Sequence, residues 1–114
     1  MAKAEELTGL SPEQADLVEI NEAFSAQVLA VLTSMRSEEF ARQHLGRDRY
    51  LGKISKDKLN VNGGSIALGH PVGATGARLV LTSLKELARR RAQRALVTLC
   101  VGGGQGAALW LERL

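Results

Sequence analysis

Aromatic residues, cysteine and histidine are all scarce in this chain, and each shortage excludes a class of protein. Only 4% of the 114 residues are aromatic, too few for a row of rings on which single-stranded nucleic acids could stack. The single cysteine, Cys100, cannot form an intramolecular disulfide, which fits a reducing compartment such as the cytoplasm. With only two widely spaced histidines beside it, a structural zinc site is not expected.

Long apolar runs are also missing. No stretch approaches the ~18 residues of a transmembrane helix, and the first residues form no apolar signal core, so neither membrane insertion nor export is expected. The net charge is only +3, and much of the excess lies in one basic cluster, Lys85, Arg89, Arg90, Arg91 and Arg94. A solvated helix end is the favoured interpretation of this cluster, and a phosphate-binding patch is the alternative.

The pattern of apolar residues predicts a single α/β domain in which short strands feed helices. Residues 2–8 are typical of a helix that ends at Gly9, and Ser11 before Pro12 starts a short turn. We expect strands over 16–20, 95–100 and 107–112, helices over 22–35, 38–45 and 74–91, and a polar surface excursion over 47–58. The last helix is expected to pack through one apolar face, formed by Ala77, Val80, Leu81, Leu84 and Leu87.

Three residues stand where regular elements end, which is where functional groups on α/β scaffolds collect. Asn21 separates a strand from a helix, His70 lies in a glycine-rich bend before the last long helix, and Cys100 ends an apolar strand. Each has a structural alternative: Asn21 as a helix cap, His70 as a hydrogen-bonded turn group, and Cys100 as core filler. Taken singly, each residue is better explained by its structural alternative.

The sequences around these three residues change that balance. The chain contains, in this order, NEAF at 21–24, NGGSIALGHP at 62–71 and CVGGGQG at 100–106. Together they closely resemble the three motif blocks of thiolase carboxyl-terminal domains, in the family's order and near its spacing. The resemblance covers nearly the whole chain and implies an α/β fold with a mixed sheet and helices. Segment 40–58 resembles the fatty-acid-oxidation type, which includes subunits of β-oxidation multienzyme complexes.

The resemblance implies an enzyme that cleaves 3-ketoacyl-CoA with CoA to acetyl-CoA and a shortened acyl-CoA, or runs the reverse Claisen condensation. His70 would deprotonate a nucleophilic cysteine, and Cys100 would be the second acid/base. Asn21 would hold a water in one oxyanion hole, and the N–H of Gly102 would contribute to the second. Ala23 and Phe24 are expected to lie near the pantetheine end of the substrate. The resemblance also implies that coenzyme A is a substrate, and neither a permanently bound cofactor nor a metal is expected.

The chain also departs from the family's pattern. The nucleophilic cysteine of thiolases lies in an amino-terminal half, whereas Cys100 corresponds to the acid/base. The first strand of the carboxyl-terminal domain has no counterpart either. Residues 1–114 are therefore expected to form a partial carboxyl-terminal domain that is inactive alone and acts on CoA thioesters with an amino-terminal half or as a homo-oligomer. Without that companion, it is expected to expose an apolar face and an unpaired strand edge.

Two other functions stay open at this point. A non-catalytic thiolase-like module would bind a CoA ester or a protein partner without chemistry. A nucleic-acid-binding protein would use the basic cluster, with an affinity that falls steeply with salt. Because no nucleic-acid-binding motif accompanies the charge, nucleic acid is not expected to be a partner.

Overall fold

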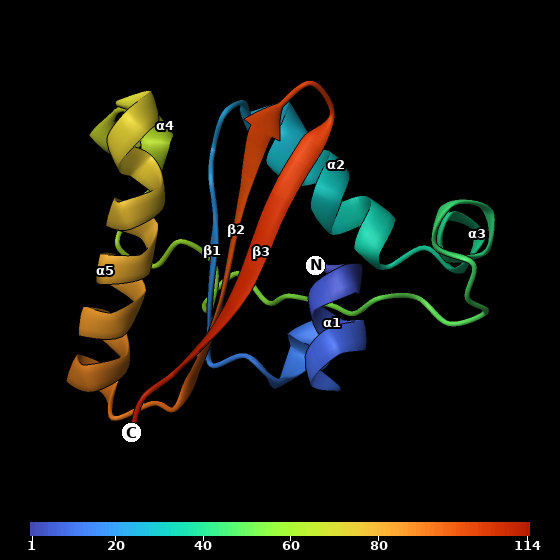
Figure 1. Cartoon of the computed structure of the whole chain (residues 1–114), viewed down its shortest axis with the longest axis horizontal. Helices are drawn as coiled ribbons and strands as arrows, with labels where there is room; N and C mark the ends of the chain where they lie inside the picture. The colour runs from blue at the N-terminus through green and yellow to red at the C-terminus, as the bar shows by residue number, and fades with distance from the viewer.

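The computed structural model describes residues 1–114 and is built around a three-stranded mixed sheet (Figure 1). The strands are β1 (Leu17–Ile20), β2 (Arg94–Gly102) and β3 (Gln105–Glu112). β1 runs parallel to β2, and β2 runs antiparallel to β3, so that the order in the sheet is β1-β2-β3. The mixed sheet with helices predicted from the sequence is confirmed.

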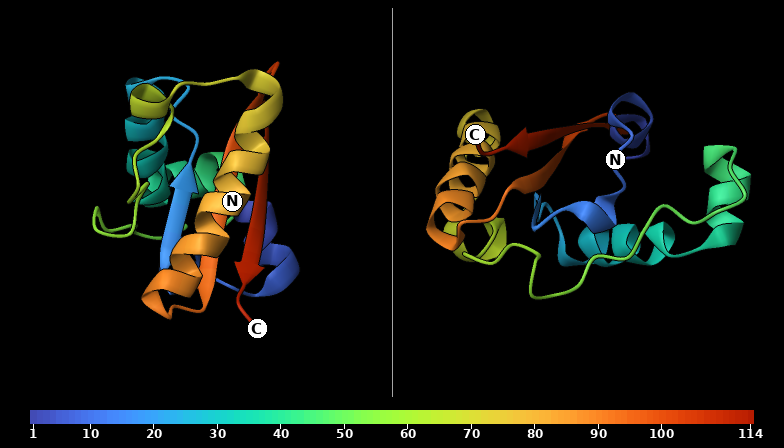
Figure 2. Two further views of the ribbon diagram at one scale, coloured as in Figure 1. Left: turned by 90° about the vertical axis from the view of Figure 1, so that its left-hand side faces the viewer. Right: turned by 90° about the horizontal axis from the view of Figure 1, so that it is seen from below.

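Helices cover both faces of this sheet (Figures 1 and 2). The long helix α5 (Val72–Arg90) lies on one face, and α1 (Ala2–Thr8) and α2 (Ser25–Met35) lie on the other. Because β1 is covered on both sides, all four of its residues are buried. A strand of this kind can present functional groups only at its ends.

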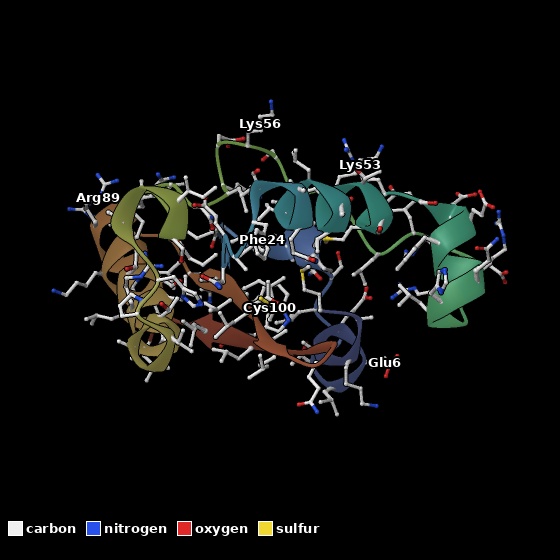
Figure 3. The ribbon with its side chains drawn as sticks, turned by 90° about the horizontal axis from the view of Figure 1, so that it is seen from above. Glu6, Phe24, Lys53, Lys56, Arg89 and Cys100 are labelled. Atoms are coloured by element: carbon white, nitrogen blue, oxygen red, sulfur yellow. The ribbon has the colours of Figure 1, made fainter.

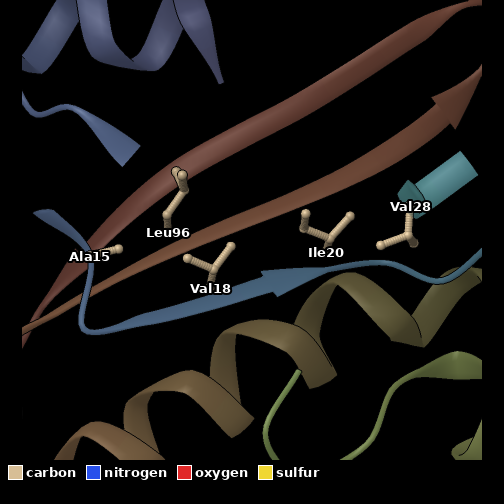
Figure 4. Packing of buried hydrophobic residues seen from close by; sticks show 5 residues of the cluster. All are labelled: Ala15, Val18, Ile20, Val28 and Leu96. Carbon is tan, nitrogen blue, oxygen red and sulfur yellow. The ribbon is translucent and has the colours of Figure 1, made fainter. Parts of the chain in front are cut away.

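Two clusters of buried apolar side chains hold the layers together. The cluster on the α2 side consists of Ala15, Val18, Ile20, Val28 and Leu96 (Figure 4). The cluster on the α5 side consists of Leu17, Leu87 and Ala95. Alternate residues of β1 enter opposite clusters because successive side chains of a strand point to opposite faces. The short strand therefore fixes the positions of both helix layers.

The remaining helices are short: η1 (Pro12–Gln14), α3 (Glu38–Phe40), η2 (Ala41–Leu45) and α4 (Ser65–Leu68). As expected, α1 ends at Gly9, and Ser11 forms a capping box with Gln14. The Ser37 hydroxyl accepts a hydrogen bond from the backbone N–H of Phe40 and caps α3, which η2 continues to residue 45. The predicted helix over 38–45 is thus present, with its last five residues in π-helical form.

Several predicted boundaries are wrong by one to three residues; β1 begins at Leu17 instead of residue 16, and α5 spans Val72–Arg90 instead of 74–91. Helix α2 begins at Ser25 instead of residue 22, because Phe24 is extended and the Glu22 side chain binds a different segment. The hairpin is also tighter than the expected turn over 101–106. Only Gly103 and Gly104 form the turn, and pairing resumes between Gly102 and Gln105. Both strands of the hairpin are therefore longer than the apolar pattern predicted.

The segment 47–58 has no regular structure, as expected, but part of it is not on the surface. Leu51 and Gly52 are buried, and the N–H groups of both donate to the carbonyl oxygen of Met35, at 2.9 and 3.1 Å. The last carbonyls of a helix need donors from outside the helix. This segment supplies two of them, so it folds back and closes the end of α2.

The predicted apolar face of α5 is largely not the buried one. The helix buries Thr75, Leu79, Ser83, Glu86 and Leu87 against the sheet. Only Leu87 of the predicted set is among them, and Leu81 remains 54% exposed. The rest of the predicted set instead lines an open apolar groove, hereafter the α5 groove, whose sheet side includes Val97, Leu99 and Leu109. The outer edge of β3 has no neighbouring strand, so the chain exposes the apolar face and the free edge expected.

None of the helices combines the length and the apolar character needed to span a bilayer. No group of three or more His, Cys, Asp or Glu side chains is arranged to hold a metal ion.

The α5 groove predicts self-association of the isolated 114-residue chain, since exposed apolar patches drive association. Sedimentation velocity should show a weight-average mass that rises with concentration. The substitution Leu81→Lys should reduce this rise by placing a charge in the groove. The matched control is Leu7→Lys, at a 76% exposed position on α1 on the opposite face of the sheet. This substitution should leave the rise in mass unchanged. A monomeric parent chain at all concentrations, with a cooperative melt, would contradict the prediction.

Candidate functional site

The parallel strands β1 and β2 finish at one end of the molecule, where helix α5 also begins (Figure 1). Asn21, Cys100 and His70 belong to the ends of these elements. Asn21 directly follows β1, and its backbone N–H donates to the carbonyl oxygen of Thr98 on β2 at 3.0 Å. Cys100 is two residues further along β2. His70 belongs to the loop between α4 and α5, and the first turns of α5 reach β2, where Gly76 faces Leu99. Carboxyl ends of parallel strands are the usual location of sites on α/β sheets.

Asn21 is buried, with 2% of its surface exposed. Its side-chain oxygen Oδ1 accepts a hydrogen bond of 2.6 Å from the hydroxyl of Ser65. Its side-chain nitrogen Nδ2 is also buried and has no hydrogen-bond partner. The residue does not cap α2, because Phe24 holds that position, so the structural alternative for Asn21 is wrong. A buried amide donor without a partner is costly, and such groups in folded proteins call for an explanation.

The neighbouring Glu22 joins the first motif to the second. Its carboxylate accepts hydrogen bonds from Asn60 Nδ2 at 3.0 Å and from the backbone N–H of Ile66 at 3.1 Å. Gly64 makes this approach possible, because a Cβ atom built there would lie 2.2 Å from the Glu22 carboxylate carbon. Glu22 was not among the functional residues predicted from the sequence. Two features of the sequence could have pointed to Glu22: its position in the first motif, and the paired glycines of the second motif.

His70 is exposed and is held from one side. Its Nδ1 lies 2.7 Å from the hydroxyl of Thr75, a fully buried residue in the first turns of α5. The structural alternative for His70, a hydrogen-bonded turn group, is therefore confirmed. It does not conflict with a chemical role, since the imidazole has two nitrogens and the contact with Thr75 occupies one.

Cys100 is exposed, so the core-filler alternative is wrong. It pairs with Gly106 across the hairpin, and the register shifts between Cys100 and Gly102. Gly102, Gly103 and Gly104 have φ angles of 101°, 58° and 78°, a region that residues with a side chain rarely adopt. No atom would contact a Cβ at any of the three, so these glycines are required by backbone conformation. Figure 3 looks onto this end of the molecule, with Cys100 and the 74% exposed Phe24 labelled, and the half-buried Ala23 precedes Phe24.

A buried acid, which the sequence analysis did not single out, lies between the sheet and α5. Glu19 on β1 is 3% exposed, and burial raises the pKa of its carboxyl to about 7. The positive charge of Arg78 opposes this shift in the pKa, whereas Glu22 and Glu86 reinforce it. The sequence of this short, mostly apolar strand gave no sign that the Glu19 carboxyl would be buried with a raised pKa.

Part of the basic cluster is paired with two acidic side chains. Glu86 is buried, and its carboxylate accepts from Arg89 Nε at 2.7 Å and also from Arg90. The Arg89 hydrogen bond is the main cause that lowers the pKa of Glu86 to about 2. Arg94 pairs with Glu112 at 3.2 Å. Three of the five cations are thus engaged within the chain, which supports the helix-end interpretation over a phosphate-binding patch.

Comparison with known proteins gives one consistent result. The family model described as "Thiolase, C-terminal domain" matches residues 1–113. The 3-ketoacyl-CoA thiolase of Pseudoalteromonas translucida (strain TAC 125) is 51% identical over 104 residues, which are 91% of this chain and 24% of that protein. The 3-ketoacyl-CoA thiolase of Klebsiella pneumoniae (strain 342) is 49% identical over 107 residues, which are 94% and 24% of the two chains.

Among solved structures, the acetyl-CoA acetyltransferase of Bacillus anthracis matches with a TM-score of 0.78 at 43% identity. The match covers 98% of this chain and 24% of that one. The chain therefore spans about a quarter of the length of these relatives.

Gly64→Ala is expected to destabilise the fold by about 2–3 kcal/mol, because the added methyl must displace the Glu22 carboxylate and break its hydrogen bonds. Urea denaturation measures the change. The matched control is Gly73→Ala in the first turn of α5, where a methyl meets nothing within 4 Å. That variant should gain about 0.5–1 kcal/mol. Equal stability of the two variants would show that Glu22 has no fixed position.

Glu19→Gln is expected to change the dependence of stability on pH. Because the folded-state pKa of Glu19 is about 7 and its ordinary value is 4.5, its contribution to stability is fully present below pH 4.5 and is lost as pH rises through 7. The loss should amount to about 1–3 kcal/mol. Denaturation of both proteins between pH 4.5 and 8 gives a difference curve in which the parent loses this stability and the variant does not. A flat difference curve would refute it.

Proposed function

Because the chain belongs to the thiolase family, through its match to the C-terminal domain over residues 1–113, we propose that it supplies one side of a thiolase active site. The reaction is cleavage of 3-ketoacyl-CoA by CoA to acetyl-CoA and a shortened acyl-CoA, or the reverse Claisen condensation. One observation carries the proposal. Three distant segments bring a thiol, an imidazole and an amide to one end of the sheet, and the amide donor of Asn21 is buried without a partner.

Cys100 and His70 handle the protons of this reaction. In the synthetic direction the Cys100 thiolate removes a proton from the methyl carbon of acetyl-CoA, and in cleavage the thiol returns it to the carbanion. The exposure of Cys100 at the hairpin supports this role, since a substrate can reach it. His70 deprotonates the nucleophilic cysteine and donates to the enolate oxygen. Its contact with Thr75 leaves Nε2 available for both steps.

Two groups stabilise negative charge on thioester oxygens. Asn21 holds a water through its free Nδ2 and completes the first oxyanion hole. The N–H of Gly102 contributes to the second, where a residue without a side chain allows a thioester to approach the backbone. Phe24 is extended and exposed before α2, as a residue that contacts pantetheine would be, and Ala23 lies beside it. Coenzyme A is thus a substrate, and the reaction needs no permanently bound cofactor.

The nucleophilic cysteine comes from an amino-terminal thiolase half, because Cys100 is the only cysteine among residues 1–114 and is already assigned. Residues 1–114 then act as a partial carboxyl-terminal domain, with the α5 groove and the free edge of β3 as surfaces for the companion half or a second copy. A role in fatty-acid β-oxidation within a multienzyme complex, and a cytoplasmic location, belong to the same proposal. Segment 40–58 and the single cysteine support them.

The test combines the purified chain with a separately expressed amino-terminal thiolase half and follows CoA-dependent cleavage of acetoacetyl-CoA. The chain alone should give no turnover, and the combination should give turnover. Cys100→Ala and His70→Ala should each lower kcat about 10²–10⁴-fold, the usual contribution of a positioned acid or base. The matched control is His44→Ala, which removes the other histidine of the chain. His44 lies in η2 with its ring beside that of Phe40, and its substitution should leave kcat unchanged.

Two results would count against the proposal. Turnover by the chain alone would show that it does not depend on a cysteine from elsewhere. CoA binding by the combination without any turnover would instead indicate a non-catalytic thiolase-like module.

A further inference from the structure

A directional chain of hydrogen bonds reaches Asn21 from α5. Arg78 Nη2 donates to the hydroxyl oxygen of Ser65 at 3.0 Å. The Ser65 hydroxyl in turn donates to Asn21 Oδ1 at 2.6 Å. Ser65 is the first residue of α4 and is buried, so its hydroxyl is shielded from solvent by the same fold that buries Asn21.

The chemistry of the three groups sets the direction of this chain. A guanidinium group can only donate, so Ser65 must accept from Arg78. A serine hydroxyl has one proton, and the only other polar atom bonded to it here is that of Asn21. If Asn21 presented Nδ2 instead, the Ser65 oxygen could accept a second hydrogen bond, but the buried hydroxyl proton would then have no acceptor. The arrangement that satisfies this proton places Oδ1 toward Ser65. The amide then presents its donor, Nδ2, on the opposite side, where it has no partner within the chain.

An asparagine amide can turn by about 180° with little change in shape, because its oxygen and nitrogen are nearly equal in size. The two orientations are opposite in polarity. With Nδ2 outward the residue donates to an oxygen or a water, and with Oδ1 outward it repels developing negative charge. An unguided Asn21 would populate both, and only the first suits an oxyanion hole.

We propose that Ser65 is a positioning residue, which, polarised by Arg78, fixes the Asn21 amide with its donor turned toward the substrate. The inference rests on the thiolase function proposed above. It extends that function to Ser65 and Arg78, two residues that do not contact the substrate.

The first test needs no activity. In the 114-residue chain labelled with ¹⁵N and ¹³C, the Nδ2 protons of Asn21 should show no nuclear Overhauser contact with the β protons at position 65, since Oδ1 faces that residue. In Ser65→Ala the contact should appear, because the amide is free to turn. Ser83→Ala removes another buried hydroxyl, one that bonds to Leu79, and is the matched control that should leave the Asn21 spectrum unchanged.

The second test uses the chain combined with the amino-terminal half. Ser65→Ala should lower kcat about 10-fold or more with KM changed less than about 2-fold, as expected for an interaction that strengthens in the transition state. Ser65→Thr, which keeps the hydroxyl, should restore most of kcat, and Ser83→Ala should behave as the parent.

The outcomes separate the two proposals. A contact between Nδ2 and position 65 in the parent chain overturns the positioning role, and this measurement requires no variant to fold. An unchanged kcat in Ser65→Ala also overturns it. Loss of turnover in every protein, with the spectroscopic change still present, would refute the thiolase function and leave the orientation of Asn21 established.

Discussion

The carboxylate of Glu22 is the contact on which the functional end of the molecule depends. It reaches from the end of β1 into the glycine-rich segment and binds the first turn of α4 from a position that only a glycine at 64 leaves free. Asn60 reinforces this junction by bonding both the Ile20 backbone and Glu22. Since His70 follows α4 after one residue, the placement of the imidazole relative to Asn21 depends on these hydrogen bonds of the Glu22 carboxylate.

The layer between α5 and the sheet is unusually polar for a small domain. Thr75, Ser83, Glu86 and Glu19 are all buried there. Part of this polarity serves structure, as Ser83 bonds back to Leu79 and Glu86 holds two arginines. The part nearest the site, Thr75 and the Arg78–Ser65 pair, supports the imidazole and the amide. Other apolar side chains of the same helix, among them Val80, Leu81 and Leu84, meanwhile line the open groove, so α5 is built to be covered from two sides.

The sequence predicted the elements, and the end of the sheet to which Asn21 and Cys100 belong, better than it predicted what surrounds them. Capping residues such as Ser11 and Ser37, and the period of the apolar residues, locate the elements because these signals are local. The buried face of α5 was predicted wrongly, because hydrophobicity alone cannot tell which face meets a strand that carries Glu19. The exposure of Cys100 could not be predicted either, since a residue at the end of an apolar strand is expected in the core until the register of the hairpin is known. Ser65 and Arg78 escaped notice because their role exists only across three segments.

The tip of the hairpin imposes a constraint of a different kind. Three successive residues, Gly102, Gly103 and Gly104, have positive φ angles, yet the space around each would admit a side chain. What this turn rejects is therefore the handedness of an L-amino acid and not its volume. A polypeptide that makes the same bend next to Cys100 therefore strongly favours the achiral residue at all three positions, and the backbone N–H groups it exposes are a by-product of that preference.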